Sequence, residues 1–166
     1  MKDTYYLAID LGATSGRAMV AAYSDGRVTM RELTRFETIQ IHRDGHIYWD
    51  LAHLHSEILK ALQQIKAEGI ELTSIGIDTW GCDVTLFGKG LPIAMPFCYR
   101  DPQTDGAMER FFSECMSRGE LYERTGIQFM PFNTLFQLYT MFHGPCHVQK
   151  KRKRDRCVPS GAALCR

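Results

Sequence analysis

The sequence predicts an α/β fold built on a mixed β-sheet, and three observations predict it. Residues 5–10 and 17–23 are apolar, are rich in strand-forming residues and precede a hairpin turn. Residues 51–65 carry apolar side chains at helical spacing. Residues 73–80, with the sequence TSIGIDTW, form a short apolar run that indicates a buried strand. Because this strand follows a helix, we expect it to join the sheet in parallel.

The first three strands are expected to form an antiparallel meander. The sequence SDGR at 24–27 contains Asp25 and Gly26, a pair that takes positive φ in tight hairpin turns. Residues 28–38 alternate well enough between apolar and polar side chains to form the third strand. A second turn is marked by the Asp-Gly pair at 44–45.

The helix that follows has clear ends. Asp50 is a good N-cap, and Gly69 is a natural C-terminal stop. The apolar positions between them are Leu51, Leu54, Ile58, Leu62 and Ile65. Further along, the sequence CDVTLFGKGLPI at 82–93 indicates another strand and a glycine-rich turn. Residues 103–116 and 132–142 are predicted to be helical.

Length and composition indicate a globular protein of the cytoplasm. The 166 residues are enough for one ordinary domain, and 45% of them are hydrophobic, which excludes a disordered chain. The N-terminus holds no long apolar run, so we expect no signal peptide, no membrane partner and a cytoplasmic location. None of the six cysteines forms a C-x-x-C pair, so reduced thiols are expected rather than a disulfide framework.

The last two dozen residues differ in composition from the rest of the chain. Residues 143–166 carry a net charge of +6, whereas residues 1–142 carry −5 and hold every aromatic residue. We therefore predict a lobe at 1–142 and a basic tail at 143–166 that is disordered or translated out of frame. The run KKRKRDR could contact a phosphate backbone. A solvated tail is the commoner case, so we expect no nucleic-acid partner.

The stretch LAIDLGATSGRAMV at 7–20 places a carboxylate, Asp10, beside a turn made of small residues. Small residues let a ligand approach the backbone closely, and successive N–H groups in such a turn form a nest for anions. Because Asp10 would repel a bare phosphate, a phosphate site here needs Mg²⁺ between the two. The turn also offers two hydroxyls and one guanidinium, and the predicted phosphate-binding residues are Gly12, Ala13, Thr14, Ser15, Gly16 and Arg17.

A plainer interpretation of the same stretch stays open. Neither G-x-x-x-x-G-K-[ST] nor G-x-G-x-x-G occurs at this turn. The stretch could therefore be an ordinary β-turn between two strands.

Four motifs, taken in their order and spacing, resemble the N-terminal lobe of an FGGY-type carbohydrate kinase. They are IDLGATSGR, IGIDTWGCDVTLF, YRDPQT and TGIQFMPFNTLFQL, and the resemblance covers residues 5–142. It implies a ribonuclease H-like fold of the actin, Hsp70 and sugar kinase superfamily, present here as an incomplete N-terminal lobe. It also implies that ATP, with Mg²⁺, and a sugar bind in a cleft between two lobes.

Within the family, the fourth motif is most similar to that of members that phosphorylate L-rhamnulose. This similarity implies that ATP and L-rhamnulose are the partners and that L-rhamnulose 1-phosphate is the product. Two other functions stay open. One is an FGGY kinase of another ketose or a polyol, and the other is a non-catalytic relative that binds ATP or sugar.

The resemblance implies roles for particular residues. Residues 13–17 match the phosphate-binding hairpin of the family, and Asp10 matches the carboxylate that faces the metal. Gly81 matches a backbone position that contacts the sugar, with Trp80 and Asp83 as neighbours in the cleft. A further segment that faces the sugar is matched by Tyr99, Arg100 and Asp101.

Some of these residues, and one near them, also have a purely structural interpretation. Gly81 could serve only as a turn residue, and Trp80 could serve only in packing. Arg100 and Asp101 could form a surface ion pair of little consequence. Asp78, which lies inside the apolar strand, could be hydrogen-bonded in the core.

The chain also departs from the family it resembles. In the family, the aspartate that accepts the proton of the sugar hydroxyl lies well past the matched segment, and so does the second lobe. No catalytic residue is therefore assigned among these 166 residues. We expect the chain to be inactive on its own.

Overall fold

A computed structural model describes residues 3–143 of the chain. Its contacts divide the chain into two compact units. Within the described residues, unit 1 comprises residues 3–41 and 49–81, and unit 2 comprises residues 42–48 and 82–143. Apart from His143, the basic tail lies outside the described residues, so the lobe boundary and the character of the tail stay predictions.

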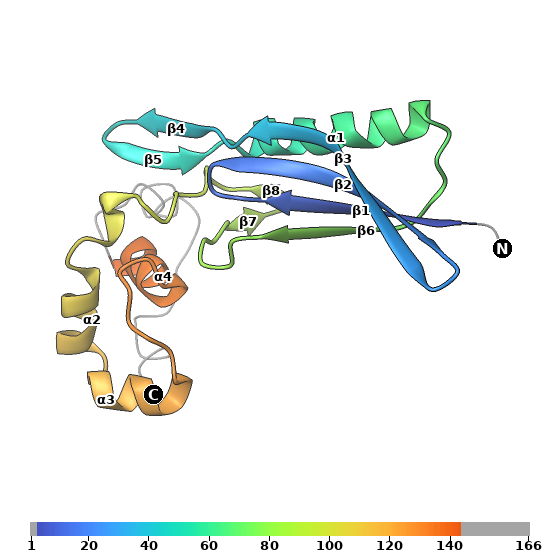
Figure 1. Cartoon of the computed structure of the whole chain (residues 1–166). Helices are drawn as coiled ribbons and strands as arrows, with labels where there is room; N and C mark the ends of the chain where they lie inside the picture. The colour runs from blue at the N-terminus through green and yellow to red at the C-terminus, as the bar shows by residue number, and fades with distance from the viewer. Residues whose placement is uncertain (1–2, 144–166) are drawn as a thin grey trace. The chain divides into compact units, whose positions relative to one another are not determined.

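Unit 1 is built on a four-stranded mixed sheet. Its strands are β1 (Thr4–Leu11), β2 (Ser15–Ser24), β3 (Arg27–Glu37) and β6 (Leu72–Thr79), in the order β3-β2-β1-β6 (Figure 1). The first three strands pair antiparallel, and β6 pairs parallel to β1. At the tip of the β2–β3 hairpin, Asp25 and Gly26 have φ of 50° and 77°. The predicted meander and the predicted parallel strand are both confirmed.

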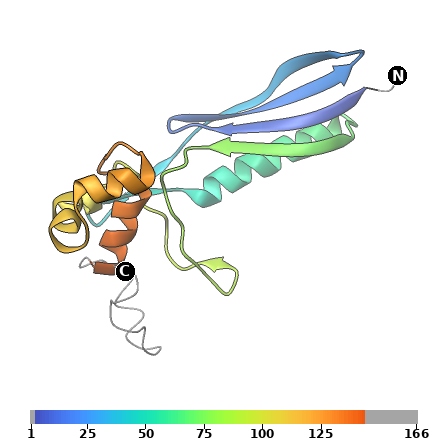
Figure 2. The ribbon, with the colours of Figure 1, turned by 90° about the horizontal axis from the view of Figure 1, so that it is seen from below.

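Helix α1 (Leu51–Ala67) covers one face of this sheet (Figure 2). As predicted, Asp50 caps it, because the carboxylate accepts a hydrogen bond of 2.9 Å from the backbone N–H of His53. Gly69, at φ 69°, follows its C-terminus. Apolar side chains of β1, β2 and α1 form the buried core of the unit, namely Leu7, Ile9, Ala18, Val20, Ala61 and Ile65.

Strand β6 is more exposed than the sequence predicts. Its side chains Ile75 and Ile77 lie opposite Leu7 and Ile9 of β1, yet they are 48% and 55% exposed. Within residues 3–143, β6 is one of the two edge strands of the sheet, with β1 as its only neighbour. The apolar composition of residues 73–80 predicts a buried strand, and this prediction is wrong within residues 3–143.

Two small hairpins accompany the main sheet. Strands β4 (Gln40–Arg43) and β5 (His46–Trp49) pair around the predicted turn, where Asp44 and Gly45 have φ of 53° and 79°. Strands β7 (Phe87–Gly88) and β8 (Leu91–Pro92) form a second pair. The strand predicted within 82–93 is therefore reduced to this hairpin of two-residue strands.

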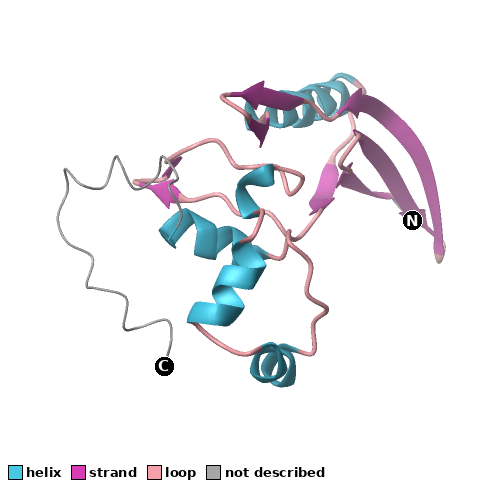
Figure 3. Cartoon of the chain, turned by 90° about the vertical axis from the view of Figure 1, so that its left-hand side faces the viewer, coloured by secondary structure: helices cyan, strands magenta, loops and turns pink. Residues whose placement is uncertain are grey.

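Unit 2 is mainly helical (Figure 3). It contains the 3₁₀ turn η1 (Pro102–Thr104) and the helices α2 (Ala107–Glu114), α3 (Arg118–Thr125) and α4 (Thr134–His143). Helix α4 confirms the prediction for 132–142, whereas the helix predicted at 103–116 is interrupted at Gly106, which has φ 67°. The core of unit 2 is formed by Ala107, Phe111, Leu121, Phe136 and Tyr139.

Among residues 3–143, no helix combines the length and the apolar composition that a membrane span requires.

Candidate functional site

The glycine-rich turn between β1 and β2 is shaped by its own packing. The N–H of Gly12 donates to the carbonyl of Ser15 at 3.1 Å, and a Cβ on Gly12 would lie 2.7 Å from that same oxygen. A Cβ on Gly16 would overlap the ring of Phe36, which lies directly opposite on β3. Local packing thus disfavours a Cβ at both positions, through a backbone oxygen at Gly12 and an aromatic ring at Gly16, whether or not a phosphate binds.

Thr38 fixes this turn from the far side. Its hydroxyl donates to the carbonyl of Gly12 at 2.7 Å, and its N–H donates to the carbonyl of Thr14 at 3.1 Å. Thr38 is buried, being 7% exposed. This role has no local signal in the sequence, because a threonine after a strand carries no motif and its partners lie more than 20 residues away.

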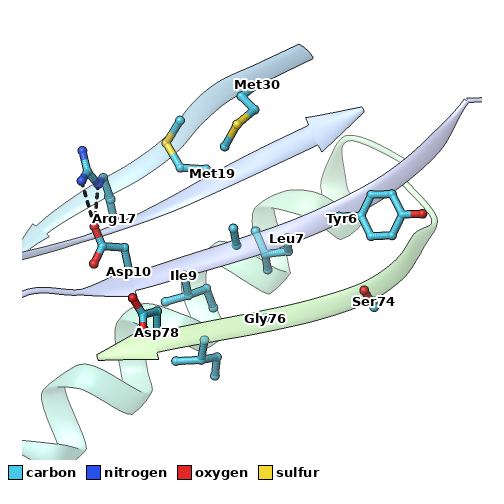
Figure 4. Close-up of a pocket in the computed structure, with 12 residues that line it drawn as sticks. Tyr6, Leu7, Ile9, Asp10, Arg17, Met19, Met30, Ser74, Gly76 and Asp78 are labelled. Atoms are coloured by element: carbon cyan, nitrogen blue, oxygen red, sulfur yellow. Dashed lines mark hydrogen bonds and ion pairs between the residues drawn. The ribbon is translucent and has the colours of Figure 1, made fainter. Parts of the chain in front are cut away.

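Asp10 and Arg17 face each other across the β1–β2 pair (Figure 4). Nη2 of Arg17 lies 2.8 Å from Oδ2 of Asp10, and Nε donates to the same oxygen at 2.9 Å. Both side chains are about half exposed. The predicted anion-binding guanidinium and the predicted metal-facing carboxylate are therefore adjacent, and each neutralises the other in this structure.

Asp78 lies next to this pair. It stands opposite Asp10 in the parallel register of β1 and β6, and it is exposed on the same face of the sheet. The alternative that Asp78 is hydrogen-bonded in the core is therefore wrong. Asp10, Arg17 and Asp78 gather at one end of an open groove along this face (Figure 4).

This pair of carboxylates suits a nucleotide-bound Mg²⁺ better than a metal held by protein alone. Mg²⁺ usually binds one or two carboxylates and completes its shell with water and phosphate oxygens. Asp10 and Asp78 supply such a donor set at the carboxyl ends of two neighbouring strands. No group of three or more His, Cys, Asp or Glu side chains within 3–143 is arranged to hold a metal ion by itself.

Two of the predicted sugar residues, Trp80 and Gly81, lie in unit 1. The Trp80 ring packs on Trp49 with centroids 4.2 Å apart, so its packing role is real. Gly81 differs from the glycines of the turn, because a Cβ there would meet nothing within 4 Å. Its backbone is exposed, as a position that contacts a ligand through the main chain requires.

Asp101 has a structural role within unit 2. Its side chain is 0% exposed and accepts hydrogen bonds from the N–H of Ile47 at 2.6 Å and of Gln103 at 2.8 Å. The ring of His46 lies 3.1 Å from the same carboxylate. Arg100 lies over the ring of Tyr99 at 5.3 Å, so the alternative of an Arg100–Asp101 surface pair is wrong within the described residues.

Asp83 is the remaining predicted sugar residue in unit 2, and two cysteines lie close to the predicted residues in the sequence. Asp83 is partly exposed, and one of its oxygens accepts a hydrogen bond from Gln137 of α4 at 3.0 Å. Burial raises the pKa of the thiols of Cys82 and Cys98, and the charge of Asp83 acts in the same direction. Both thiols therefore stay protonated at neutral pH, which excludes a reactive thiolate at these positions.

The structure thus brings the predicted phosphate and metal residues together at the end of the sheet of unit 1 where β1 turns into β2. The predicted sugar residues are divided, with Trp80 and Gly81 in unit 1 and Asp83 and the segment 99–101 in unit 2.

This fold is found in solved sugar kinases. Glycerol kinase from Plasmodium falciparum, solved with ADP, matches with a TM-score of 0.67 at 15% identity, over 92% of this chain and 31% of that one. A carbohydrate kinase from Novosphingobium aromaticivorans matches with a TM-score of 0.62 at 20% identity, over 84% of this chain and 28% of the other. The predicted fold class, an incomplete sugar kinase lobe with a mixed sheet and helices, is confirmed.

The sequence defines the family more closely. Residues 5–150 match the profile of the FGGY family of carbohydrate kinases, N-terminal domain. The chain is 46% identical over 142 residues to rhamnulokinase from Bacteroides thetaiotaomicron and 38% identical over 161 residues to rhamnulokinase from Bacillus subtilis. The chain belongs to the FGGY family of carbohydrate kinases. The two matches cover 85% and 96% of this chain. The chain spans only 29% and 32% of the length of the two relatives.

Proposed function

We propose that this chain is the N-terminal lobe of a kinase that transfers the γ-phosphoryl group of ATP to L-rhamnulose, giving L-rhamnulose 1-phosphate. The carrying observation is the Asp10–Arg17 pair beside a braced, glycine-rich turn. The choice of sugar is supported by the name of the relatives, which are rhamnulokinases at 38–46% identity.

On the nucleotide side, the turn and its two charged neighbours have complementary tasks. Backbone N–H groups of residues 13–16 and the Arg17 guanidinium bind phosphate oxygens. Asp10, with Asp78 beside it, holds the cation that accompanies the nucleotide. Asp10 and Asp78 would hold Mg²⁺ there, and the ion would supply positive charge that offsets the negative charge of the phosphates. In such transfers the protein mainly supplies positioning and electrostatic stabilisation.

On the sugar side, the residues divide into those that contact the ligand and one that supports them. In unit 1, the exposed backbone of Gly81 and the Trp80 ring are the proposed sugar contacts, and in unit 2 they are, separately, Asp83, Tyr99 and Arg100. An aromatic face and a carboxylate match the apolar and hydroxyl surfaces of a sugar. Asp101, which is buried against His46, holds the segment 99–101 in place and does not face the ligand.

Calorimetric titration of the 166-residue chain with ATP, with and without Mg²⁺, tests the nucleotide assignment. We expect Mg²⁺ to strengthen ATP binding and Asp10→Asn to abolish this gain. Asp25→Asn, at the exposed β2–β3 turn, is the matched control and is expected to leave binding unchanged. ATP binding that is indifferent to both Mg²⁺ and Asp10→Asn would show that the turn does not serve a nucleotide.

A further inference from the structure

The side-chain amide of Gln137 contacts both residues that follow Gly81, which are Cys82 and Asp83. Gln137 lies on α4 and is 1% exposed. Its Nε2 lies 3.0 Å from Oδ1 of Asp83, 3.2 Å from the carbonyl of Cys82 and 2.9 Å from the carbonyl of Phe132. Three oxygens surround one nitrogen, so the opposite orientation of the amide would place oxygen against oxygen.

A second side chain on the same face of α4 reinforces this contact. The hydroxyl of Thr134 donates to the carbonyl of Cys82 at 2.6 Å. Residues three apart on a helix lie on one face, so Thr134 and Gln137 act on the same short segment. Both contacts join positions more than 50 residues apart in the sequence.

The amide is retained at an energetic cost. Within residues 3–143, Oε1 of Gln137 is buried and has no hydrogen-bond partner. A buried acceptor without a partner is unfavourable, and an apolar side chain of similar shape would avoid it. Violations of this kind concentrate at functional sites. We therefore infer that glutamine is needed at position 137 for the N–H donors of its side chain.

We propose that Gln137 is a positioning residue of the sugar site, which sets the direction of the Asp83 carboxylate and contributes to the choice of sugar. The inference rests on the proposed function, in which Asp83 contacts the sugar. A hydroxyl that meets a carboxylate of fixed direction is recognised by its position, and a site built this way rejects analogues that misplace the hydroxyl. Gln137 belongs to the motif TGIQFMPFNTLFQL, so this contact links that motif physically to the sugar.

The first test measures the side-chain rotamer of Asp83 in the full 166-residue chain by NMR χ1 couplings. We expect one rotamer in the parent and rotamer averaging in Gln137→Met, which keeps the shape but removes the donors. Gln137→Glu, which replaces the donors by a charged acceptor, should also release Asp83. Gln128→Met is the matched control at an exposed glutamine and should leave Asp83 unchanged. A single unchanged Asp83 rotamer in folded Gln137→Met would overturn the proposal.

The reverse measurement covers the case in which the buried variants fail to fold. Asp83→Ala changes a partly exposed residue, and its effect is followed at the side-chain NH₂ resonances of Gln137. We expect these resonances to shift and their hydrogen exchange to accelerate. If they do not move, Gln137 does not hold Asp83 and the proposal is wrong.

Sugar binding separates this inference from the function on which it rests. Calorimetry with L-rhamnulose and with D-xylulose is expected to show preference for L-rhamnulose in the parent. Gln137→Met should weaken L-rhamnulose binding roughly tenfold, which corresponds to the loss of one hydrogen bond to a charged group. The ratio of the affinities for L-rhamnulose and D-xylulose should fall as well. Absence of sugar binding in the parent counts against the proposed function, whereas parent binding that Gln137→Met leaves unchanged counts against the role of Gln137.

Discussion

Gly16 shows how a residue that resembles a ligand site can have a demanding structural task. It pairs with Phe36 across β2 and β3, and the aromatic ring occupies the space where a Cβ would stand. Phe36 is itself buried, so it has little freedom to move aside. A defect in ATP binding caused by a change at Gly16 would therefore mix a phosphate effect with a folding effect.

We expect Gly16→Ala to lower the free energy of unfolding by about 1–3 kcal/mol, the usual cost of overpacking. Urea unfolding followed by circular dichroism measures it. Adding Phe36→Leu should recover part of the loss, because the smaller side chain vacates the ring position. Gly76→Ala, on β6 with nothing within 4 Å of the added Cβ, is the control and should change stability little. Equal losses in both glycine variants would contradict the packing argument.

Thr38 makes a second prediction possible at this scale. Thr38→Val removes the hydroxyl that donates to the Gly12 carbonyl and keeps both the side-chain volume and the backbone bond to Thr14. We expect a loss of about 1 kcal/mol in stability and faster hydrogen exchange at the Gly12 amide. Thr29→Val, exposed on β3, should show neither change. An unchanged exchange rate at Gly12 would mean that Thr38 does not brace the turn.

The site residues show which parts of a site a sequence can predict. Asp10 and the small residues after it were predictable because the chemistry and the neighbours lie within eight positions. The role of Asp101 was not, because its partners His46 and Ile47 lie more than 50 positions away. Gln137 and Thr38 were missed for the same reason. Local sequence predicts the turn proposed to bind phosphate, whereas the roles of Thr38, Asp101 and Gln137 depend on tertiary contacts.

At the scale of elements, local signals predicted the meander, α1 and β6 because caps, turns and apolar periodicity agree there. Helix α3 was missed, since only Leu121 on it is buried and its sequence is mostly polar. Its start nevertheless carries a local signature, because the Ser117 hydroxyl accepts from the N–H of Glu120 at 3.2 Å. The exposure of β6 was beyond local reasoning, since it depends on which strands lie beside it.

The packing of α4 on α2 has a predicted pH dependence. The Tyr139 hydroxyl donates to the carboxylate of Glu114. This hydrogen bond, together with burial and the charge of Glu114, raises the pKa of Tyr139 from 10 to about 12. Folding therefore favours the protonated phenol. Its contribution is fully present below pH 10 and is lost as the pH rises from 10 toward 12.

We expect the stability difference between the parent and Tyr139→Phe to be constant below pH 10 and to shrink toward pH 12, measured by urea unfolding across this range. The comparison cancels the titration of other groups common to both proteins. Tyr122→Phe, at an exposed position on α3, is the control and should show no such trend. A Tyr139→Phe difference that stays flat through pH 12 would contradict the raised pKa.

At the scale of the whole molecule, the division into two units follows the division of the proposed chemistry. The residues assigned to ATP and Mg²⁺ lie in unit 1, and most residues assigned to the sugar lie in unit 2. The units are not consecutive in sequence, because residues 42–48 belong to unit 2 although they lie within the span of unit 1. Composition and periodicity carry no information on such an arrangement, so the sequence predicts a single lobe over residues 1–142.

We expect the 166-residue chain alone to show no measurable L-rhamnulose kinase turnover in a coupled assay of ADP release. No residue in it is assigned as the base that accepts the proton of the sugar hydroxyl, and general-base catalysis typically contributes about 10²–10⁴-fold. Holding the γ-phosphate in line with the hydroxyl accounts for roughly 7–11 kcal/mol of barrier lowering. In the family that the chain resembles, this positioning also requires the second lobe, which lies beyond the matched segment. Rhamnulokinase from Bacteroides thetaiotaomicron, of which this chain spans 29%, is the positive control. Sugar-dependent ADP release within tenfold of that control would mean that the base and the nucleotide clamp both lie among these residues. The first positions to examine would then be Asp78 and Asp83, the two carboxylates that flank Trp80 and Gly81.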